Sequence, residues 1–264
     1  MKAIVSAMSV MLAVCILDGA WAGTWYVDVS VPKAGDGTSW EKALEKIQAG
    51  INKAADGDTV IVAQGTYVEN IQFKGKNLIL TSTNPLNWNT VASTVIDANK
   101  SGSVVRFAGT ENQTCVLSGF TIRNGAGTWI AQDANFSGGG ILGVDPAVNL
   151  SMTPFTHATI QNNIITSNSA DIGAGVDVCD GLIRNNIIIG NSGSASGTGG
   201  GIGFCHGTIE SNSIVGNSSM GGGGIAHSNA VFRNNVVVAN IGFGGGGEGW
   251  FISAHRSMAP RAGR

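Results

Sequence analysis

The side chains best suited to chemistry form a column in which imidazole and carboxylate groups recur at a nearly constant interval along the chain. The column consists of His157, Asp180, His206 and Asn229. A carboxylate between two imidazoles could hold a cation or transfer protons near neutral pH. A ladder of the same side chains on a protein surface would need no function. Both interpretations stay open, and His157, Asp180 and His206 are candidate ligand-binding residues.

Two insertions carry a second set of candidates, whose chemistry suits a sugar. Their aromatic, amide and carboxylate side chains are Trp129, Gln132, Asp133, Asn135 and Phe136 in residues 126–137, and Asp145, Asn149 and Phe155 in residues 144–156. Aromatic faces with nearby amides and carboxylates suit a sugar ring, and loops projecting from a solenoid often build a groove. The insertions therefore predict a glycan-binding groove. Its candidate residues are Trp129, Gln132, Asp133, Asn135, Asp145 and Phe155. The alternative is that the two loops only pack on each other.

Cys179 and Cys205 directly precede Asp180 and His206, so they share the interval of that column. On adjacent turns of a repeat structure their Cα atoms would be about 4.8 Å apart, which is within the range of a disulfide. The pair is therefore either a disulfide or part of a ladder of small buried thiols. No Cys-x-x-Cys or paired His spacing accompanies it, so we expect no metal site.

These spacings belong to a repeat in the second half of the chain. Four copies of one pattern, in which a polar pair ending in Asn is flanked by apolar residues, occupy residues 160–165, 183–188, 209–214 and 232–237. Gly-x-Gly followed by a β-branched residue keeps the same period, at Val176, Ile202 and Ile225. Short β-rich units at such a period predict a β-solenoid, in which each coil buries its apolar face against its neighbours.

Aligned coil by coil, the repeat predicts which side chains stack. An inward aliphatic stack is expected at Ile165, Ile188, Ile214 and Val237. Two ladders of Asn amides bonded along the axis are expected at Asn163, Asn186, Asn212 and Asn235 and at Asn168, Asn191, Asn217 and Asn240. An outward column with ion pairs between coils is expected at Gln161, Arg184, Glu210 and Arg233.

The N-terminal part of the chain predicts a leader and a cap. Residues 1–22 have the positive end, the apolar run and the small-x-small end of a secretory signal peptide, and the run is too short for a transmembrane anchor. Residues 23–58 contain a strand and one amphipathic helix, which opens with a capping box at Thr38 and Glu41. Apolar residues then recur at helical spacing, at Trp40, Ala43, Leu44, Ile47, Ile51 and Ala54. A lone helix before a solenoid fits a cap over the first coil.

Residues 25–28 (WYVD), 55–67 (ADGDTVIVAQGTY) and 117–125 (LSGFTIRNG) resemble the bacterial right-handed parallel β-helix proteins of the pectate-lyase-like superfamily. The resemblance runs from about residue 24 to residue 247. It implies a right-handed coil and an extracellular polysaccharide or cell-surface glycan as partner. Ca²⁺ is the one cofactor that it suggests. The Gly-Gly-Gly-Ile repeat and residues 232–235 also resemble the repeats of bacterial surface adhesins.

Charge and the placement of acids limit the activity. The net charge is −2 with 12% of residues charged, which gives no basic surface for nucleic acid. Catalysis of the pectate-lyase type needs clustered carboxylates for Ca²⁺ beside an Arg or Lys base. The acids of this chain are instead scattered, at Asp133, Asp145, Asp171, Asp177 and Asp180. The adjacent Asp pairs of polygalacturonase-like hydrolases do not occur either. We therefore assign no catalytic set; an enzyme would be a polysaccharide lyase or a glycoside hydrolase.

The repeat stops in the middle of a coil near residue 247. Glu248 stands where the pattern requires a β-branched residue, and residues 248–264 contain several Arg and no recognisable cap. A shifted reading frame or a truncated gene near residue 247 would produce this change. The alternative is a native tail, with Trp250 and Phe251 covering the last coil.

These observations predict an all-β protein, a right-handed parallel β-helix over residues 59–247 of roughly eight to ten coils, preceded by an N-terminal amphipathic capping helix. We expect a secreted or surface-exposed bacterial protein, with no transmembrane span in the mature chain, that binds or processes an extracellular polysaccharide. The alternatives are a non-catalytic surface or adhesion protein and a fragment of a polysaccharide lyase.

Overall fold

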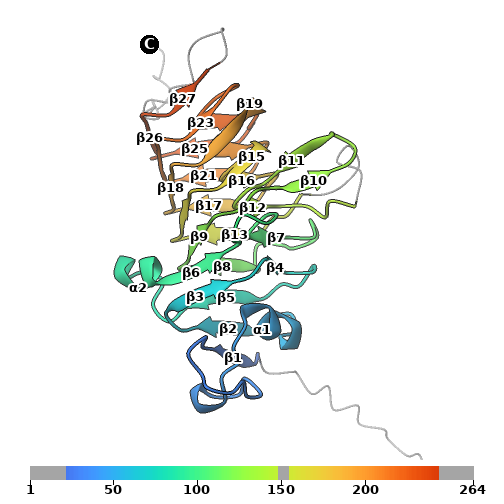
Figure 1. Ribbon diagram of the computed structural model, residues 1–264, viewed down its shortest axis with the longest axis vertical. Coiled ribbons are helices and arrows are strands. Elements are labelled where there is room, and N and C mark those ends of the chain that lie inside the picture. The colour runs from blue at the N-terminus through green and yellow to red at the C-terminus, as the bar shows by residue number, and fades with distance from the viewer. Residues whose placement is uncertain (1–21, 148–154, 244–264) are drawn as a thin grey trace, which may run out of the picture.

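The computed structural model describes residues 22–147 and 155–243, which form a stack of coils built from short strands. Strands of successive coils pair in register and build four sheets along the stack (Figure 1). All pairings of the described strands are parallel except the one between β10 and β11. The expected signal peptide and the expected tail lie almost entirely outside the described residues.

Two of the sheets share a corner that carries an Asn in each of the four C-terminal coils. Sheet A has eight strands, in the order β1 (Thr24–Val27), β2 (Thr59–Val62), β5 (Ile79–Ser82), β8 (Val116–Ser118), β13 (Thr159–Gln161), β17 (Leu182–Arg184), β21 (Thr208–Glu210) and β25 (Val231–Arg233). Sheet B has seven, in the order β3 (Gly65–Val68), β6 (Thr94–Asp97), β9 (Thr121–Arg123), β14 (Ile164–Thr166), β18 (Ile187–Ile189), β22 (Ser213–Val215) and β26 (Val236–Val238).

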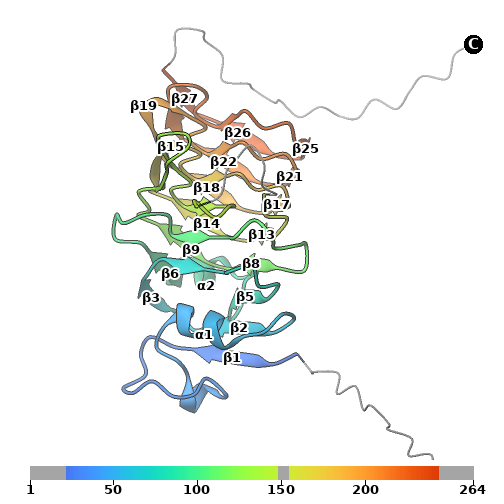
Figure 2. The ribbon, with the colours of Figure 1, turned by 90° about the vertical axis from the view of Figure 1, so that its right-hand side faces the viewer.

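The other two sheets meet at the Gly-rich corner. Sheet C has six strands, in the order β4 (Ile71–Gln72), β7 (Val105–Arg106), β12 (Ile141–Leu142), β16 (Val176–Asp177), β20 (Ile202–Gly203) and β24 (Ile225–Ala226). Sheet D has six, in the order β10 (Thr128–Ile130), β11 (Asn135–Ser137), β15 (Ser169–Ile172), β19 (Ser192–Thr198), β23 (Ser218–Ser219) and β27 (Ile241–Gly242). Viewed from the side, the coils rise from β1 at one end to β25–β27 at the other (Figure 2). This nearly all-β stack of parallel strands agrees with the predicted solenoid.

The inward aliphatic stack is confirmed. Ile165 pairs with Ile188, Ile188 with Ile214, and Ile214 with Val237. The three Ile side chains are completely buried. Because each strand is only two to four residues long in most coils, a coil has little core of its own and is stabilised by apolar contact with its neighbours.

Both Asn ladders are confirmed as well. In the first, Asn163 Nδ2 donates to Asn186 Oδ1 at 3.1 Å, and Asn186 Nδ2 donates to Asn212 Oδ1 at 3.0 Å. Each amide also donates to a backbone carbonyl of the preceding coil, as Asn186 Nδ2 does to Ile160 O at 2.9 Å. In the second ladder, Asn168 Nδ2 donates to Asn191 Oδ1 at 3.0 Å. A buried amide needs every donor and acceptor satisfied, and these ladders meet that need.

The predicted N-terminal helix is split into two pieces. They are the 3₁₀ helix η1 (Trp40–Lys42) and the α-helix α1 (Ile47–Lys53). Leu44 lies between them in extended conformation, and its backbone N–H donates to Tyr26 O at 2.9 Å. The predicted capping box does not form, because the Thr38 hydroxyl donates instead to Asp36 Oδ1 at 2.7 Å. Pairing with β1 therefore interrupts the helix that the apolar spacing predicts.

Side chains of the first coils hold α1 in place at both ends. The Glu69 carboxylate accepts from the backbone N–H groups of Ile47 and Gln48 at 2.8 and 3.0 Å, and Lys76 Nζ donates to three carbonyls at the end of the helix. The Gln48 side chain accepts from Gln72 N at 2.7 Å and donates to Gln72 O at 3.1 Å. Gln48 thus satisfies both backbone groups of Gln72 at the end of sheet C.

A second helix, α2 (Trp88–Ser93), was not expected from the sequence. Asn87 caps it, because its Oδ1 accepts from Asn89 N at 2.9 Å and Thr90 N at 3.3 Å. The helix lies against β6 and β9, and its carbonyl of Val91 accepts from the Thr121 hydroxyl at 3.0 Å. No described helix is long and apolar enough to cross a lipid bilayer.

Candidate functional site

The ionisable column contains one imidazole–carboxylate pair. His206 Nδ1 lies 3.2 Å from Asp180 Oδ1, which also accepts from the His206 backbone N–H at 3.0 Å. His157 Nδ1 lies 3.3 Å from the backbone carbonyl oxygen of Asp180 and is not hydrogen-bonded to the carboxylate of that residue. The structure therefore joins Asp180 to His206 and leaves His157 beside the pair. Among the described residues, no three His, Cys, Asp or Glu side chains gather closely enough to hold a metal ion.

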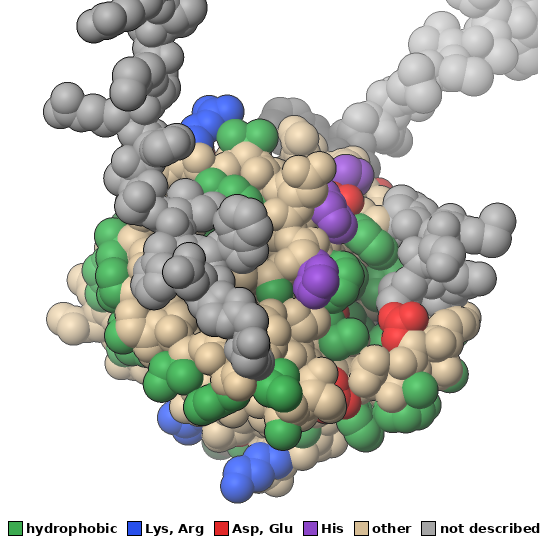
Figure 3. All heavy atoms as spheres, turned by 90° about the horizontal axis from the view of Figure 1, so that it is seen from above, with side chains coloured by type: hydrophobic (Ala, Val, Ile, Leu, Met, Phe, Trp, Pro, Cys, Tyr) green, Lys and Arg blue, Asp and Glu red, His purple; other side chains and the backbone are tan. Residues whose placement is uncertain are grey.

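Aromatic rings border this pair on the outer side of sheet C. Phe155 stacks on His206 with ring centroids 6.1 Å apart, and Phe204 stacks on His227 at 4.8 Å. Phe155 and Phe204 also pack against a small apolar cluster, which consists of Ile130, Leu142, Val144 and Val178. Viewed from above, His side chains lie beside hydrophobic ones on one side of the stack (Figure 3).

The hairpin β10–β11 directs Trp129 away from this cluster. Trp129 pairs with Phe136 across the hairpin, with ring centroids 5.2 Å apart, and the two side chains are 49% and 45% exposed. The next residue, Ile130, is completely buried in the apolar cluster. Because successive side chains of a strand point to opposite faces, Trp129 and Phe155 do not line one groove in this arrangement.

The polar candidates of the insertions lie near the loop tips. Gln132 and Asp133 are exposed, and Asn135 Nδ2 donates to the backbone carbonyl of Asp133 at 2.8 Å. Asp145 is exposed and accepts from Ala147 N at 2.9 Å. The two insertions do contact each other through Ile130, Val144 and Phe155. Asn149 lies outside the described residues.

Asp177 is a buried acid on the outer side of sheet C. Its side chain is packed against Gly173 and Gly203, the residue is 1% exposed, and Oδ1 has no hydrogen-bond partner among the described residues. Burial is the largest cause that raises the pKa of this carboxyl to about 8, and Asp133 adds to the rise, whereas the Ser137 hydroxyl lowers it. Asp177 is therefore protonated at neutral pH and does not face solvent.

The cysteine column consists of free thiols. Cys115, Cys179 and Cys205 are all buried and unpaired, and the Cys179 backbone N–H donates to Cys205 Sγ at 3.3 Å. Cys179 and Cys205 therefore belong to a ladder of buried thiols and do not form a disulfide. Burial, the largest cause, raises the pKa of Cys179 well above its ordinary value. A thiol that stays protonated is a poor nucleophile, which fits a structural role.

The charged column on sheet A stacks as predicted, but its ion pairs do not form. Gln161, Arg184 and Glu210 occupy one register. Arg184 Nε donates to Gln161 Oε1 at 2.8 Å, whereas no ion pair joins Arg184 to Glu210 within the described part of the chain. A neutral amide therefore takes the place of the expected carboxylate partner of Arg184, and the three residues are half-buried.

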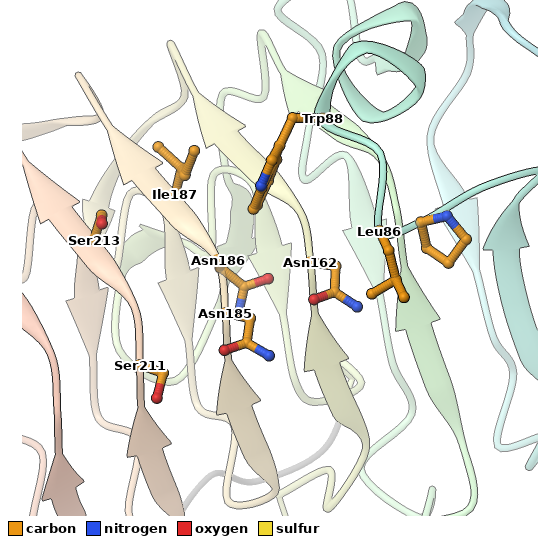
Figure 4. A pocket seen from close by; sticks show the side chains of 9 residues that line it. Leu86, Trp88, Asn162, Asn185, Asn186, Ile187, Ser211 and Ser213 are labelled. Atoms are coloured by element: carbon orange, nitrogen blue, oxygen red, sulfur yellow. The ribbon is translucent and has the colours of Figure 1, made fainter.

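A pocket of about 470 Å³ lies at the corner between sheets A and B, beneath the loop that leads into α2 (Figure 4). We call it the shelf pocket. Its lining residues are Pro85, Leu86, Trp88, Asn162, Asn185, Asn186, Ile187, Ser211 and Ser213. The Asn87 cap fixes the start of α2, and the apolar wall on either side of it is exposed, Leu86 at 78% and Trp88 at 44%. The loop thus forms an apolar wall of the pocket, and the corner forms its polar floor.

The polar floor follows from the backbone of the corner. Asn162, Asn185 and Ser211 occupy the same place in three successive coils and have φ values of 56°, 54° and 56°. This left-handed conformation turns the chain between the two sheets and is one that Asn adopts more readily than most residues. Asn162 Nδ2 donates to Ser118 Oγ at 3.3 Å, while the Asn185 side chain is exposed. The floor therefore offers amide and hydroxyl groups to a ligand.

The sequence did not indicate this pocket. Its apolar wall at Trp88 and its floor, which begins at Asn162, are far apart along the chain, and only stacking of the coils brings them together. The one local signal is Asn87, because Asn is a residue type that often caps the start of a helix. Known proteins do not help to interpret the pocket, because no family model, no curated protein and no solved structure matches the chain.

Proposed function

We propose that this chain is a secreted or surface-exposed bacterial β-helix protein of the pectate-lyase-like superfamily, and that it binds an extracellular polysaccharide in the shelf pocket. The stacked parallel sheets support a parallel β-helix. Its right hand and its superfamily rest on the resemblance of residues 24–247, and α1 is proposed as the N-terminal cap because it packs against β1, β2 and β4. Export rests on the leader-like residues 1–22.

The observation that carries the proposal is the pairing of Trp88 with the polar floor. Sugar rings have an apolar face and a rim of hydroxyls, so they are bound by an aromatic side chain together with well-placed hydrogen-bonding groups. Trp88 and Leu86 supply the apolar surface, and Asn185 and Ser211 supply the hydrogen bonds. The volume of about 470 Å³ is within the range of small-ligand sites, and so accommodates a short segment of a glycan chain.

Binding is proposed in preference to processing. The residues that line the shelf pocket have no titratable side chain, so the pocket supplies contacts without a general acid or base. The one observation that favours processing is the Asp180–His206 pair beside Phe155. If that pair acts on a polysaccharide, the protein will release oligosaccharides and Asp180→Asn will stop the release. Product analysis across a panel of polysaccharides, with and without Ca²⁺, decides this.

Two exposed tryptophans allow a matched test of the site. Trp88 lies in the shelf pocket and Trp129 lies on the hairpin, with similar exposed fractions of 44% and 49%. We expect Trp88→Ala to reduce retention on polysaccharide-containing affinity gels about tenfold or more, because it removes the stacking surface. Trp129→Ala should leave retention unchanged.

The opposite pattern, with loss only in Trp129→Ala, would place the glycan on the hairpin predicted from the sequence. Equal retention of both variants and the parent protein would mean that neither tryptophan contacts a glycan. Unfolding midpoints of the two variants serve as the folding control, since both side chains are largely exposed and neither should lower stability by much.

A further inference from the structure

The shelf pocket is uncharged along its whole lining, and this feature distinguishes among classes of glycan. The described lining residues are apolar, amide or hydroxyl side chains, with no Lys, Arg, His, Asp or Glu among them. We infer that the glycan is uncharged and lies along the solenoid axis, with one sugar ring on Trp88 and its hydroxyls bonded to the corner column of Asn162, Asn185 and Ser211. The inference rests on the proposed function and adds the substrate class and the orientation.

A uronate fits the shelf pocket less well than a neutral sugar does. A carboxylate that enters the pocket must give up water, and burial of an ionised group without a partner is costly. The nearest cation in the sequence is Arg184, which directly precedes Asn185 and already donates to Gln161 Oε1 at 2.8 Å. Glu210, which directly precedes Ser211, is negatively charged like a uronate and offers it no partner. A neutral sugar avoids this cost, and its hydroxyls match groups that both donate and accept.

The orientation follows from the repeat. Asn162, Asn185 and Ser211 each follow a strand of sheet A whose last residues pair in register, Gln161 with Arg184 and Arg184 with Glu210. Adjacent parallel strands are about 4.8 Å apart, so the column places one polar residue per coil at a constant interval. Asn185 and Ser211 are exposed, whereas Asn162 is 8% exposed. A glycan chain parallel to the axis would present hydroxyls to each of these groups in turn. A chain across the axis would reach only one of them.

Figure 4 shows the arrangement that this orientation requires. The Trp88 side chain extends from the start of α2 above the sheet, and Asn162, Asn185 and Ser211 follow one another along neighbouring strands. Asn186 belongs to the buried Asn ladder and donates to Asn212 Oδ1 at 3.0 Å and to Ile160 O at 2.9 Å, so its side chain has no free donor for a ligand. Asn185 is the exposed amide of the floor, so its substitution should weaken the binding of a glycan.

The experiment compares neutral and anionic probes of equal length on the full chain. Binding of xylohexaose, cellohexaose, mannohexaose and hexagalacturonate is measured by isothermal titration calorimetry at low and at high NaCl. We expect at least one neutral hexasaccharide to bind about tenfold or more tightly than hexagalacturonate. Its affinity should be nearly independent of salt, because no ion pair is formed.

Three variants of the same corner column test the orientation. Asn185 lines the pocket, whereas Asn234 occupies the same place in a coil beyond it, with a φ value of 51° against 54° for Asn185. Both are exposed, so Ala substitution costs a similar amount of stability at either position. We expect Asn185→Ala and Ser211→Ala each to weaken the neutral glycan about fivefold to tenfold, because an axial chain contacts both residues, and Asn234→Ala to leave its affinity unchanged.

The outcomes separate this inference from the proposed function. Tighter binding of hexagalacturonate that still depends on Trp88 would overturn the neutral class and leave the shelf pocket as the glycan site. Loss of affinity in only one of Asn185→Ala and Ser211→Ala, or equal effects of Asn185→Ala and Asn234→Ala, would overturn the axial contact with the column. Binding of no probe, or binding that Trp88→Ala does not change, would overturn the inference together with the proposed function.

Discussion

Asp177 shows how one buried side chain can make the stability of the whole solenoid depend on pH. Its carboxyl holds a proton in the folded state, where burial raises its pKa to about 8, and loses that proton at its ordinary value of 3.8 when the chain unfolds. Between these values the folded state binds more protons than the unfolded state. The contribution of Asp177 to the free energy of unfolding therefore falls as the pH rises from about 4 to about 8 and is constant above that range.

Asp177→Asn should remove this dependence, because the amide is neutral at every pH and has nearly the same shape. We expect the parent protein to lose on the order of a few kcal/mol between pH 5 and pH 8.5, and the variant to lose clearly less. Urea unfolding at the two pH values measures the difference. If parent and variant show the same pH slope, the carboxyl is hydrated in solution and the buried environment described for it is wrong.

Of the two described α-helices, α2 is the shorter one and the one that contributes to the shelf pocket. It has six residues, fewer than an isolated helix needs to be stable. Its start depends on Asn87, whose Oδ1 accepts from Asn89 N and Thr90 N. The cap directly precedes Trp88, so the side chain that fixes the helix also orients the aromatic wall of the pocket.

Asn87→Ala is expected to lower stability by about 1 kcal/mol and to weaken glycan binding, although Asn87 does not line the pocket. Asn87→Asp and Asn87→Ser keep a capping oxygen, so both should restore binding if the effect acts through the helix. Calorimetric titration with the best-binding polysaccharide measures the affinity of each variant. Normal affinity in Asn87→Ala would show that Trp88 keeps its position without the cap.

Periodicity explains which elements the sequence predicts well. The aliphatic stack and the Asn ladders were predictable because each coil repeats the same residues at the same interval. The helix over residues 38–54 was mispredicted because Leu44 pairs with Tyr26, a contact that apolar spacing does not reveal. Trp88 and Asn185 come from coils far apart in the sequence, so no local pattern indicates that they share a pocket. Contacts between non-repeated segments that are far apart in the chain cannot be predicted from a single sequence.

At the scale of the whole molecule, glycines allow the backbones of neighbouring coils to approach each other closely. At the Gly-rich corner, a Cβ on Gly201 would lie 2.5 Å from the carbonyl oxygen of Gly224 and 3.1 Å from Ile214 Cγ2. The adjacent Ile202 N–H donates to that same Gly224 carbonyl at 2.9 Å. A side chain at Gly201 must therefore separate two coils and weaken the hydrogen bonds that join them.

Gly201→Ala should consequently cost about 3 kcal/mol. Gly216→Ala is the matched control, because Gly216 has φ +62° and a Cβ added there would meet no atom within 4 Å, so only the backbone cost of about 1 kcal/mol applies. Since each coil contacts only its neighbours, hydrogen exchange in Gly201→Ala should accelerate in β20 and β24 and stay unchanged in β2 and β5. Uniform acceleration along the stack would instead mean that the solenoid unfolds as one cooperative unit, and that coupling between coils extends well beyond nearest neighbours.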